Sequence, residues 1–356
     1  MTRFIESVST HQLLPPYHSK ESVVHGFLFD IDSKAIQTYC DTYLNLGDPQ
    51  QRGFHYRPIT EAPFGLLSHT TYPRLCSLDW KTAQSLGVKA SEWDHLTQTE
   101  FFVAVPVHRF QVTRANLLVD PVIQWVQPFI ITNNATSAFS GREILGLETL
   151  YGQIVLQLPR QPRGFTFSVS LPSWKEFAPN SAQAMWPFAY VDRGAPLDAA
   201  AGQEALEGKL AKVIATLEAA IPDLASLAEG KFPETLELLI LKQFRSAADA
   251  TQAIYQALVT CENRYSDVAN MTLYDPAAVT IDFQNGDMVD EITGTFLGMK
   301  SKYRPPAMMV TAGGTPLPQG KPKVRTVKAR LAFSFTATID LMNIKSQFNF
   351  RHCTPS

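Results

Sequence analysis

The residues best placed for chemistry are an arginine and a glutamate that stand side by side in Gly141-Arg142-Glu143. An apolar run, 125–131, precedes them and a strand-like run, 153–158, follows them. Charged side chains on a turn between two strands can reach a buried pocket, where they would contact a substrate or a water molecule. The alternative is that Arg142 and Glu143 pair with other side chains and only fix the turn. We take Arg142 and Glu143 as the candidate catalytic residues, with both interpretations open.

The stretch from Gly141 to Gly146, Gly-Arg-Glu-Ile-Leu-Gly, resembles the signature of the acetoacetate decarboxylase family. In that family the turn is followed by two adjacent lysines. The first forms an imine with a β-keto acid, and the second lowers the pKa of the first. The matching positions here are Thr149 and Leu150. Because a threonine hydroxyl forms no stable imine, the resemblance implies the family's fold and pocket without its imine chemistry. The alternative for Thr149 is a strand residue that simply faces the core.

The resemblance, which extends weakly over roughly residues 23–300, implies an α+β fold that is mainly antiparallel β. The family's strands form a cone or barrel with peripheral helices around a mostly apolar pocket. His25 lies where the family usually places an arginine, close to the first strand. Together with the signature and the strand before it, this gives the expected pocket residues: His25, Trp125, Phe129, Leu147, Thr149 and Tyr151.

Two functions are compatible with this resemblance. The first is a divergent enzyme of the lyase class that acts on a small keto acid or a polyketide-like metabolite without a Schiff-base lysine. The second is a non-catalytic small-molecule binding protein that keeps the family pocket, and a structural subunit of an assembly is a weaker third. A titratable side chain in the pocket favours the enzyme, and an all-apolar lining favours the binding protein. Lys242 and Lys175 are the lysines best placed to replace the missing amine, although each also suits a strand edge.

Composition restricts the possible partners. The chain has 356 residues, 45% of them hydrophobic, and a net charge of −2, so no strong field attracts nucleic acid or an anionic membrane. No apolar run reaches the length of a transmembrane helix, and the N-terminus lacks a cleavable apolar segment. The four cysteines and eight histidines show no metal-ligand spacing. We therefore expect a cytoplasmic protein, with a small-molecule ligand, no metal, no cofactor and a possible homo-oligomeric state.

The elements that must position the candidate site are mostly strands. Alternating or β-rich runs at 101–107, 123–131, 153–158 and 165–171 predict one antiparallel sheet, with 141–152 at its mouth. Glu291 to Leu297 is predicted as a further strand, and Ser33 is predicted to cap a helix that Gly47 ends. We expect one domain, 1–356, with an N-terminal arm at 1–22 and a C-terminal extension at 301–356. Its helical insertion at 197–231 carries an apolar stripe of Leu206, Leu210, Val213, Leu217 and Ile221.

Overall fold

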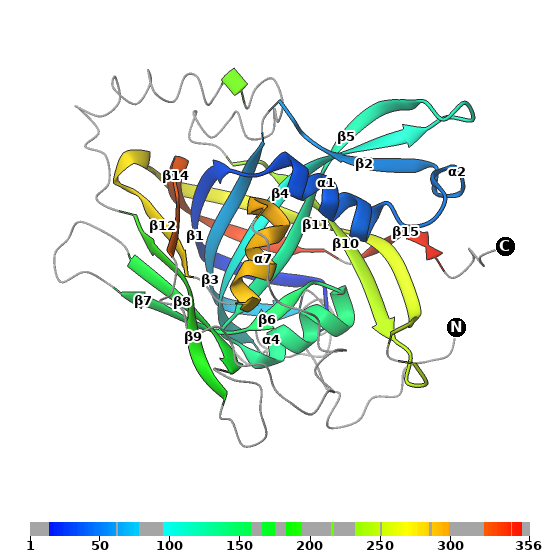
Figure 1. The fold of residues 1–356 in the computed structure, drawn as a ribbon. Coiled ribbons are helices and arrows are strands. Elements are labelled where there is room, and N and C mark those ends of the chain that lie inside the picture. The colour runs from blue at the N-terminus through cyan, green and yellow to red at the C-terminus, as the bar shows by residue number, and fades with distance from the viewer. Residues whose placement is uncertain are drawn as a thin grey trace.

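The computed structural model describes residues 14–61, 63–77, 95–157, 166–174, 183–193, 215–216, 232–249, 251–284, 287–298, 324–342 and 344–350. Strands dominate these ranges, and short helices lie at the periphery (Figure 1). The strands are β1 (Tyr17–Asp30), β2 (Phe54–Pro58), β3 (Phe64–Ser77), β4 (Leu96–Val112), β5 (Leu118–Thr132), β6 (Thr149–Tyr151), β7 (Gln153–Gln157), β8 (Thr166–Trp174), β9 (Gln183–Asp192), β10 (Thr235–Arg245), β11 (Ala253–Tyr274), β12 (Thr280–Gln284), β13 (Val324–Val327), β14 (Ala329–Leu341) and β15 (Lys345–Asn349). The helical segments are α1 (Ser33–Tyr39), η1 (Cys40–Leu44), α2 (Pro49–Arg52), α4 (Ala135–Ser140), η3 (Gly141–Leu145), η5 (Pro276–Ala278) and α7 (Asp287–Leu297). None of the described helices is long and apolar enough to cross a membrane.

The larger sheet closes into a ring. Its strands follow the order β4, β3, β1, β14, β11, β10 and β5, and β5 pairs with β4 to complete the circuit. Every pairing in the ring is antiparallel except that of β5 with β10, which is parallel and short. The prediction of a β-rich fold with few, peripheral helices is confirmed, although the sheet is mixed.

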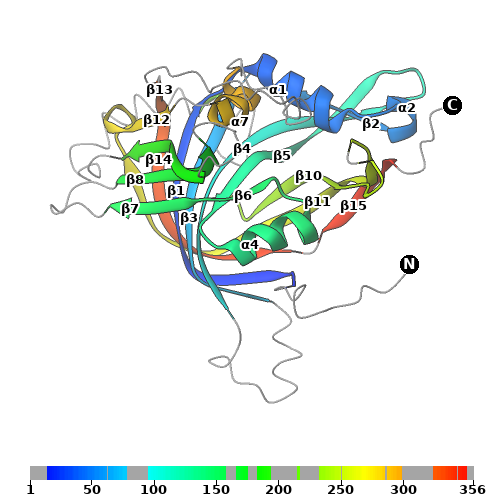
Figure 2. The same cartoon turned by 60° about the horizontal axis from the view of Figure 1, so that its bottom comes forward.

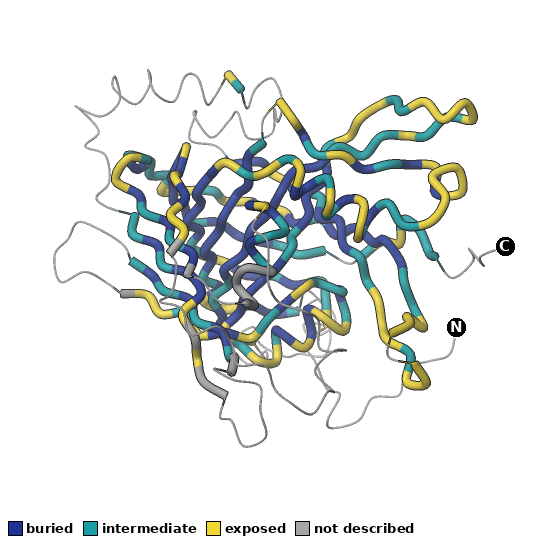
Figure 3. Tube along the Cα trace, viewed as in Figure 1, coloured by how far each residue is buried: buried dark blue, intermediate teal, exposed yellow. Residues whose placement is uncertain are grey.

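Successive residues of each ring strand face opposite sides of the sheet. On β4, Phe102 and Ala104 belong to the hydrophobic cluster inside the ring, whereas Phe101 and Val103 belong to the cluster outside it. The inner cluster contains residues from all seven ring strands, among them Val24 of β1 and Leu238 of β10. Figure 3 shows the buried positions gathered where these strands cross, with exposed positions at the hairpin tips. The ring therefore has a filled interior and a second packed layer on its outside.

The second layer is a separate sheet in the order β13, β12, β9, β8 and β7, so the prediction of a single sheet is wrong for 153–158 and 165–171. Phe167 of β8 and Phe188 of β9 pack on the outside of the closed sheet. The centroids of their aromatic rings lie 5.7 and 6.1 Å from the centroid of the Phe101 ring. The chain crosses from one sheet to the other at Gly152. A Cβ atom there would lie 2.6 Å from Ile131 Cγ2 and 2.8 Å from the Ser170 carbonyl oxygen, so this tight crossing requires glycine.

The helices cover the outside of the ring, with α1 and α7 side by side (Figures 1 and 2). The amide of Asp32 donates to the carbonyl of Phe296 at 2.8 Å and joins them. Asp32, rather than the predicted Ser33, caps α1, because its carboxylate accepts from the amides of Lys34 and Ala35. The strand predicted at 291–297 is wrong, since these residues belong to α7, which buries Phe296 against Phe29 and Phe129.

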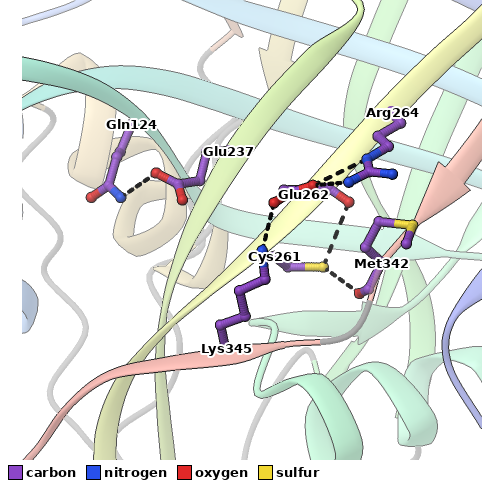
Figure 4. A network of polar contacts seen from close by, with 7 residues as sticks. All are labelled: Gln124, Glu237, Cys261, Glu262, Arg264, Met342 and Lys345. Carbon is purple, nitrogen blue, oxygen red and sulfur yellow. Dashed lines mark hydrogen bonds and ion pairs between the residues drawn. The ribbon is translucent and has the colours of Figure 1, made fainter.

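The predicted arm and the predicted extension both contribute strands to the ring. Strand β1 begins at Tyr17, inside the range predicted as an arm. Strand β14, from the predicted extension, lies between β1 and β11. The following strand, β15, pairs with β11, and Lys345 Nζ lies 2.7 Å from Glu262 Oε1 (Figure 4). The predicted insertion at 197–231 lies outside the described residues except for two helical positions, 215 and 216.

Candidate functional site

A cavity of about 60 Å³ lies inside the ring, enough for a few water molecules or the reacting end of a small metabolite. Its wall is part apolar, with Phe102, Ile130 and Leu238 from three ring strands. Polar side chains interrupt this apolar surface in two places. One group comes from β4 and the other from the 137–149 segment. The residues that line it are Tyr17, Tyr72, Leu75, Leu96, Gln98, Glu100, Phe102, Gln127, Ile130, Ser137, Ser140, Gly141, Leu145, Leu147, Thr149, Leu238, Asn263, Ile339 and Leu341.

The carboxyl group of Glu100 is the acid of this cavity. It lies on the inner face of β4, two residues before Phe102, and is only part-exposed, with surface on the cavity. The Tyr72 hydroxyl donates to Oε2 at 3.1 Å, and the Gln98 amide donates to Oε1 at 2.8 Å. Burial disfavours the charged carboxylate and raises the pKa of Glu100 to about 7, against the opposing effect of the Tyr72 hydrogen bond. Near neutral pH this side chain can therefore both accept and donate a proton.

Replacing Tyr72 with phenylalanine is expected to raise the pKa of Glu100 further. The hydroxyl stabilises the carboxylate, and a hydrogen bond to a charged group is worth about 1.5–3 kcal/mol. Titration of the Glu100 carboxyl by ¹³C NMR would measure this change. The matched control is Tyr43→Phe, since Tyr43 does not line the cavity. An unchanged or lower pKa in Tyr72→Phe would contradict the assignment.

Among the described residues, four buried polar atoms of residues that line the cavity have no hydrogen-bond partner: Gln98 Oε1, Ser140 Oγ, Thr149 Oγ1 and Asn263 Oδ1. The four residues are between 3% and 6% exposed. An unsatisfied buried polar atom costs about 1–3 kcal/mol, so such atoms ordinarily contact water or a ligand. Two of these atoms are amide oxygens, which only accept hydrogen bonds, and two are hydroxyls, which can also donate. The wall is thus suited to a molecule that presents hydrogen-bond donors.

The signature stretch folds as a helical segment rather than a simple turn. The Asn134 side chain caps α4 by accepting from the Ser137 amide, and the chain continues into the π-helical segment η3. Gly146, with φ +82°, ends it in the left-handed region. Helical geometry directs Gly141 and Leu145 inward, where both line the cavity, and Thr149 and Leu147 follow on the same wall. Leu147 and Thr149, two of the pocket residues expected from the sequence, thus line this cavity, and their role in a site stays a prediction.

Arg142 and Glu143 lie elsewhere. Both are exposed and neither lines this cavity, so the structure does not bring these two predicted catalytic residues together with it. In η3 they occupy the outer side of the turn whose inner side holds Gly141 and Leu145. Residues one position apart on a helix do not share a face. Arg142 and Glu143 therefore lie on the outside of η3.

The signature segment fills a seam in the ring. Strand β5 pairs with β10 only at Trp125 and Val126, and farther along it pairs with β6 instead. Between these two pairings the 141–148 segment lies against Lys242 of β10, whose ammonium donates to the Ile144 carbonyl. Burial lowers the pKa of Lys242, but its ammonium serves the backbone and does not line the cavity. Lys175 lies outside the described residues.

The other predicted pocket residues do not line this cavity. Trp125 is buried in the inner cluster, Phe129 is buried in the outer cluster, and Tyr151 is 50% exposed. His25 lies outside the ring opposite His69, where Arg193 Nη1 is 3.0 Å from its Nδ1. Burial is the largest cause that lowers the pKa of His25, so its imidazole is neutral at pH 7. It belongs to the contact between the two sheets.

Sequence reasoning missed Glu100 altogether. The predicted strand started at Phe101, which left Glu100 among the loop residues, whereas β4 begins at Leu96. The signal was the alternation of Gln98, Glu100, Phe102 and Ala104, which share one face of a strand. In the described part of the chain, no group of three His, Cys, Asp or Glu side chains could hold a metal ion.

Comparison with known proteins gives similarity in structure only. No family model matches the chain, and no curated protein sequence matches it. Among solved structures, acetoacetate decarboxylase from Legionella pneumophila is 10% identical, over 94% of this chain and 87% of that one, with a TM-score of 0.45. A second acetoacetate decarboxylase structure is 10% identical, over 96% and 94%, with a TM-score of 0.48. The enduracididine biosynthesis enzyme MppR, complexed with pyruvate, is 13% identical, over 96% and 93%, with a TM-score of 0.46.

Proposed function

We propose that this chain is a divergent acetoacetate decarboxylase-like enzyme of the lyase class, in which Glu100 acts as general acid and base without a Schiff base. The observation that supports the proposal most is the Glu100 carboxyl, whose pKa burial raises to about 7 and whose surface faces a cavity. General acid–base catalysis is most efficient when the pKa of the group lies near the working pH. A binding protein has no need of such a group, whereas an enzyme that moves protons does.

The charges of the lining residues bear on the substrate. Among the described residues of the wall there is no lysine, arginine or histidine, and Glu100 is the acid. A keto acid would bring its own carboxylate close to Glu100 with no cation to compensate either charge, which is unfavourable in a buried site. A neutral carbonyl compound with hydroxyl groups would satisfy the amide oxygens of Gln98 and Asn263. Of the two substrate classes suggested by the sequence, we therefore favour the polyketide-like one.

The proposed reaction is the dehydration of a β-hydroxyketone. The Glu100 carboxylate takes the proton from the carbon between the carbonyl and the hydroxyl-bearing carbon. The hydroxyls of Ser140 and Thr149, which have no hydrogen-bond partner among the described residues, would donate to the carbonyl oxygen as charge develops on it. The protonated Glu100 then returns its proton to the departing hydroxyl. A C–H and a C–O bond break, a C=C bond forms, and water leaves.

Diacetone alcohol, a neutral β-hydroxyketone, is a suitable probe for this proposal. In deuterated buffer, ¹H NMR would follow both exchange of its α-hydrogens and formation of mesityl oxide. We expect catalysis by the native chain, and a loss of about 10²–10⁴-fold in Glu100→Gln. Glu237→Gln is the matched control, because Glu237 does not line the cavity. Saturable binding without exchange or turnover would favour the non-catalytic binding protein, and faster release of CO₂ from acetoacetate would favour a keto acid.

No borohydride-trappable imine with acetoacetate is expected. An imine requires an unprotonated amine in the cavity, and no described lining residue is a lysine. Lys242, the nearest candidate from the sequence, donates to the Ile144 carbonyl. Mass spectrometry after borohydride reduction would test this, with an acetoacetate decarboxylase that carries the two lysines as the positive control. A stoichiometric adduct on one lysine would identify a nucleophile and refute the prediction.

A further inference from the structure

A second cavity, of about 90 Å³, lies outside the ring against the same seam. It is lined by Tyr39 and Tyr43 of α1 and η1, by Thr295 of α7 and by Glu148. Glu148 is exposed, so this outer cavity is next to solvent. The rest of its lining is mostly apolar, with Pro128, Leu239, Ile240 and Leu241, so the outer cavity has a mixed wall with a larger polar share than the inner one.

The inner and outer cavities share two lining residues, Gln127 and Leu147. Gln127 lies on β5 just beyond its last pairing with β10, and the β4–β5 register shifts between Val126 and Phe129. Leu147 comes from the segment that fills the seam. The backbone is thus interrupted between the cavities, and side chains form much of the partition.

Both side chains form part of the partition and keep some accessible surface. The side-chain amide of Gln127 makes no hydrogen bond to any described residue, and the side chains of Gln127 and Leu147 are both partly buried. The backbone around them is anchored: the Leu147 amide donates to the Gly141 carbonyl at 2.9 Å, and the Ile130 amide donates to the Glu148 carbonyl at 3.0 Å. A passage here would require rotamer changes of these two side chains, with Leu147 moving away from the inner cluster that it packs against, and no unfolding of the anchored backbone.

We propose that Gln127 and Leu147 form the gate through which substrate enters the inner cavity, and that the outer cavity holds the part of a longer substrate that the ring cannot contain. This inference rests on the proposed function of the inner cavity. It assigns Leu147 as the residue that determines substrate length. The expected ligand has a neutral carbonyl end for Glu100 and a hydroxylated end for the phenols and the carboxylate outside.

Accessibility of an introduced thiol tests the gate without requiring a substrate or turnover. Ser140 lines the inner cavity but not the outer one, and it is 4% exposed. The thiol of Ser140→Cys would therefore report the arrival of a small neutral reagent in the inner cavity. The reagent is methyl methanethiosulfonate: the thiolate attacks its sulfenyl sulfur, a methyl disulfide forms, and methanesulfinate leaves. Peptide mass spectrometry separates this site from the native cysteines, of which Cys40, Cys76 and Cys261 are buried.

Leu147→Ala and Thr295→Trp are each combined with Ser140→Cys in a double variant. Leu147→Ala should open the gate and accelerate modification about tenfold, and Thr295→Trp should fill the outer cavity and slow modification about tenfold. Leu96→Trp is the control, because Leu96 lines the inner cavity away from the outer one. If neither Leu147→Ala nor Thr295→Trp changes the rate, or if only Leu96→Trp slows it, the gate is refuted. Failure of the diacetone alcohol assay would leave this result unaffected, so the two proposals fail separately.

Discussion

Glu100→Gln is expected to stabilise the folded chain at alkaline pH by about 2–3 kcal/mol. Each pKa unit corresponds to about 1.4 kcal/mol, and burial raises the pKa of Glu100 from 4.5 to about 7. The lower part of that range allows for solvation of the carboxyl by water in the cavity. Glutamine carries no charge at any pH and therefore avoids the cost of burying a carboxylate.

The sign of the pH dependence follows from proton binding. Between pH 4.5 and about 7 the folded chain keeps a proton on Glu100 that the unfolded chain has lost. The contribution of Glu100 to the free energy of unfolding therefore falls as pH rises through this window and is lowest above it. The variant should match the native chain below pH 4.5 and exceed it above pH 7, as measured by urea denaturation.

The unpaired atom of Gln98 makes this substitution well tolerated. With its amide reversed, Gln98 would accept through Oε1 from the new amide nitrogen, while Tyr72 would still donate to the new carbonyl oxygen. Glu262→Gln is a control of opposite sign, because hydrogen bonds from Lys345 and Arg264 lower the pKa of Glu262. Its removal should cost a little stability above that pKa and nothing below it. Equal pH profiles for native and Glu100→Gln chains would contradict the assignment.

Gly146→Ala should lower the free energy of unfolding by about 2–5 kcal/mol. The residue has φ +82°, and the left-handed conformation costs a residue with a Cβ about 1–2 kcal/mol. The added methyl would also lie 2.6 Å from Lys242 Cβ and 2.8 Å from Lys242 Cα. Because Lys242 is paired with Ala257 in the ring, its backbone cannot retreat without disturbing the sheet. Overpacking of this kind costs about 1–3 kcal/mol more.

Gly47→Ala separates the two causes. Gly47 has φ +69°, and a Cβ there would meet nothing within 4 Å, so this variant should show the conformational cost alone. The difference between the urea midpoints of the two variants measures the contact with Lys242. Equal losses would show that the seam has room for a methyl group.

The local sequence pattern predicted the individual strands well, but it predicted poorly which strands pair with one another. Alternation along 101–107 and 165–171 identifies both as strands, because the two-residue period is a property of the segment itself. Which strands pair depends on contacts between residues far apart in sequence, and β4 and β8 lie in different sheets. In 291–297 the β-branched residues favoured a strand, but the packing of Phe296 against Phe29 and Phe129 stabilises a helix there.

The sequence directed attention to the signature segment, but it did not indicate the carboxyl group that faces the cavity. The signature segment does line the cavity through Leu147 and Thr149. Its charged residues attracted attention because of their type, but η3 directs Arg142 and Glu143 outward. The carboxyl that faces the cavity comes from β4, and only the position of that strand in the ring brings Glu100 beside Tyr72 and opposite the signature segment.

The pairing of β1 with β14 also constrains the order in which the ring can be made. In the register of these strands Tyr17 is opposite Leu341, so β1 finds one of its two neighbours far along the sequence. Until β14 leaves the ribosome, β1 and β11 each present an unpaired edge, and such edges recruit strands from other chains. Closure over so long a separation is intrinsically slow. The nascent chain is therefore expected to expose these two edges until β14 is made.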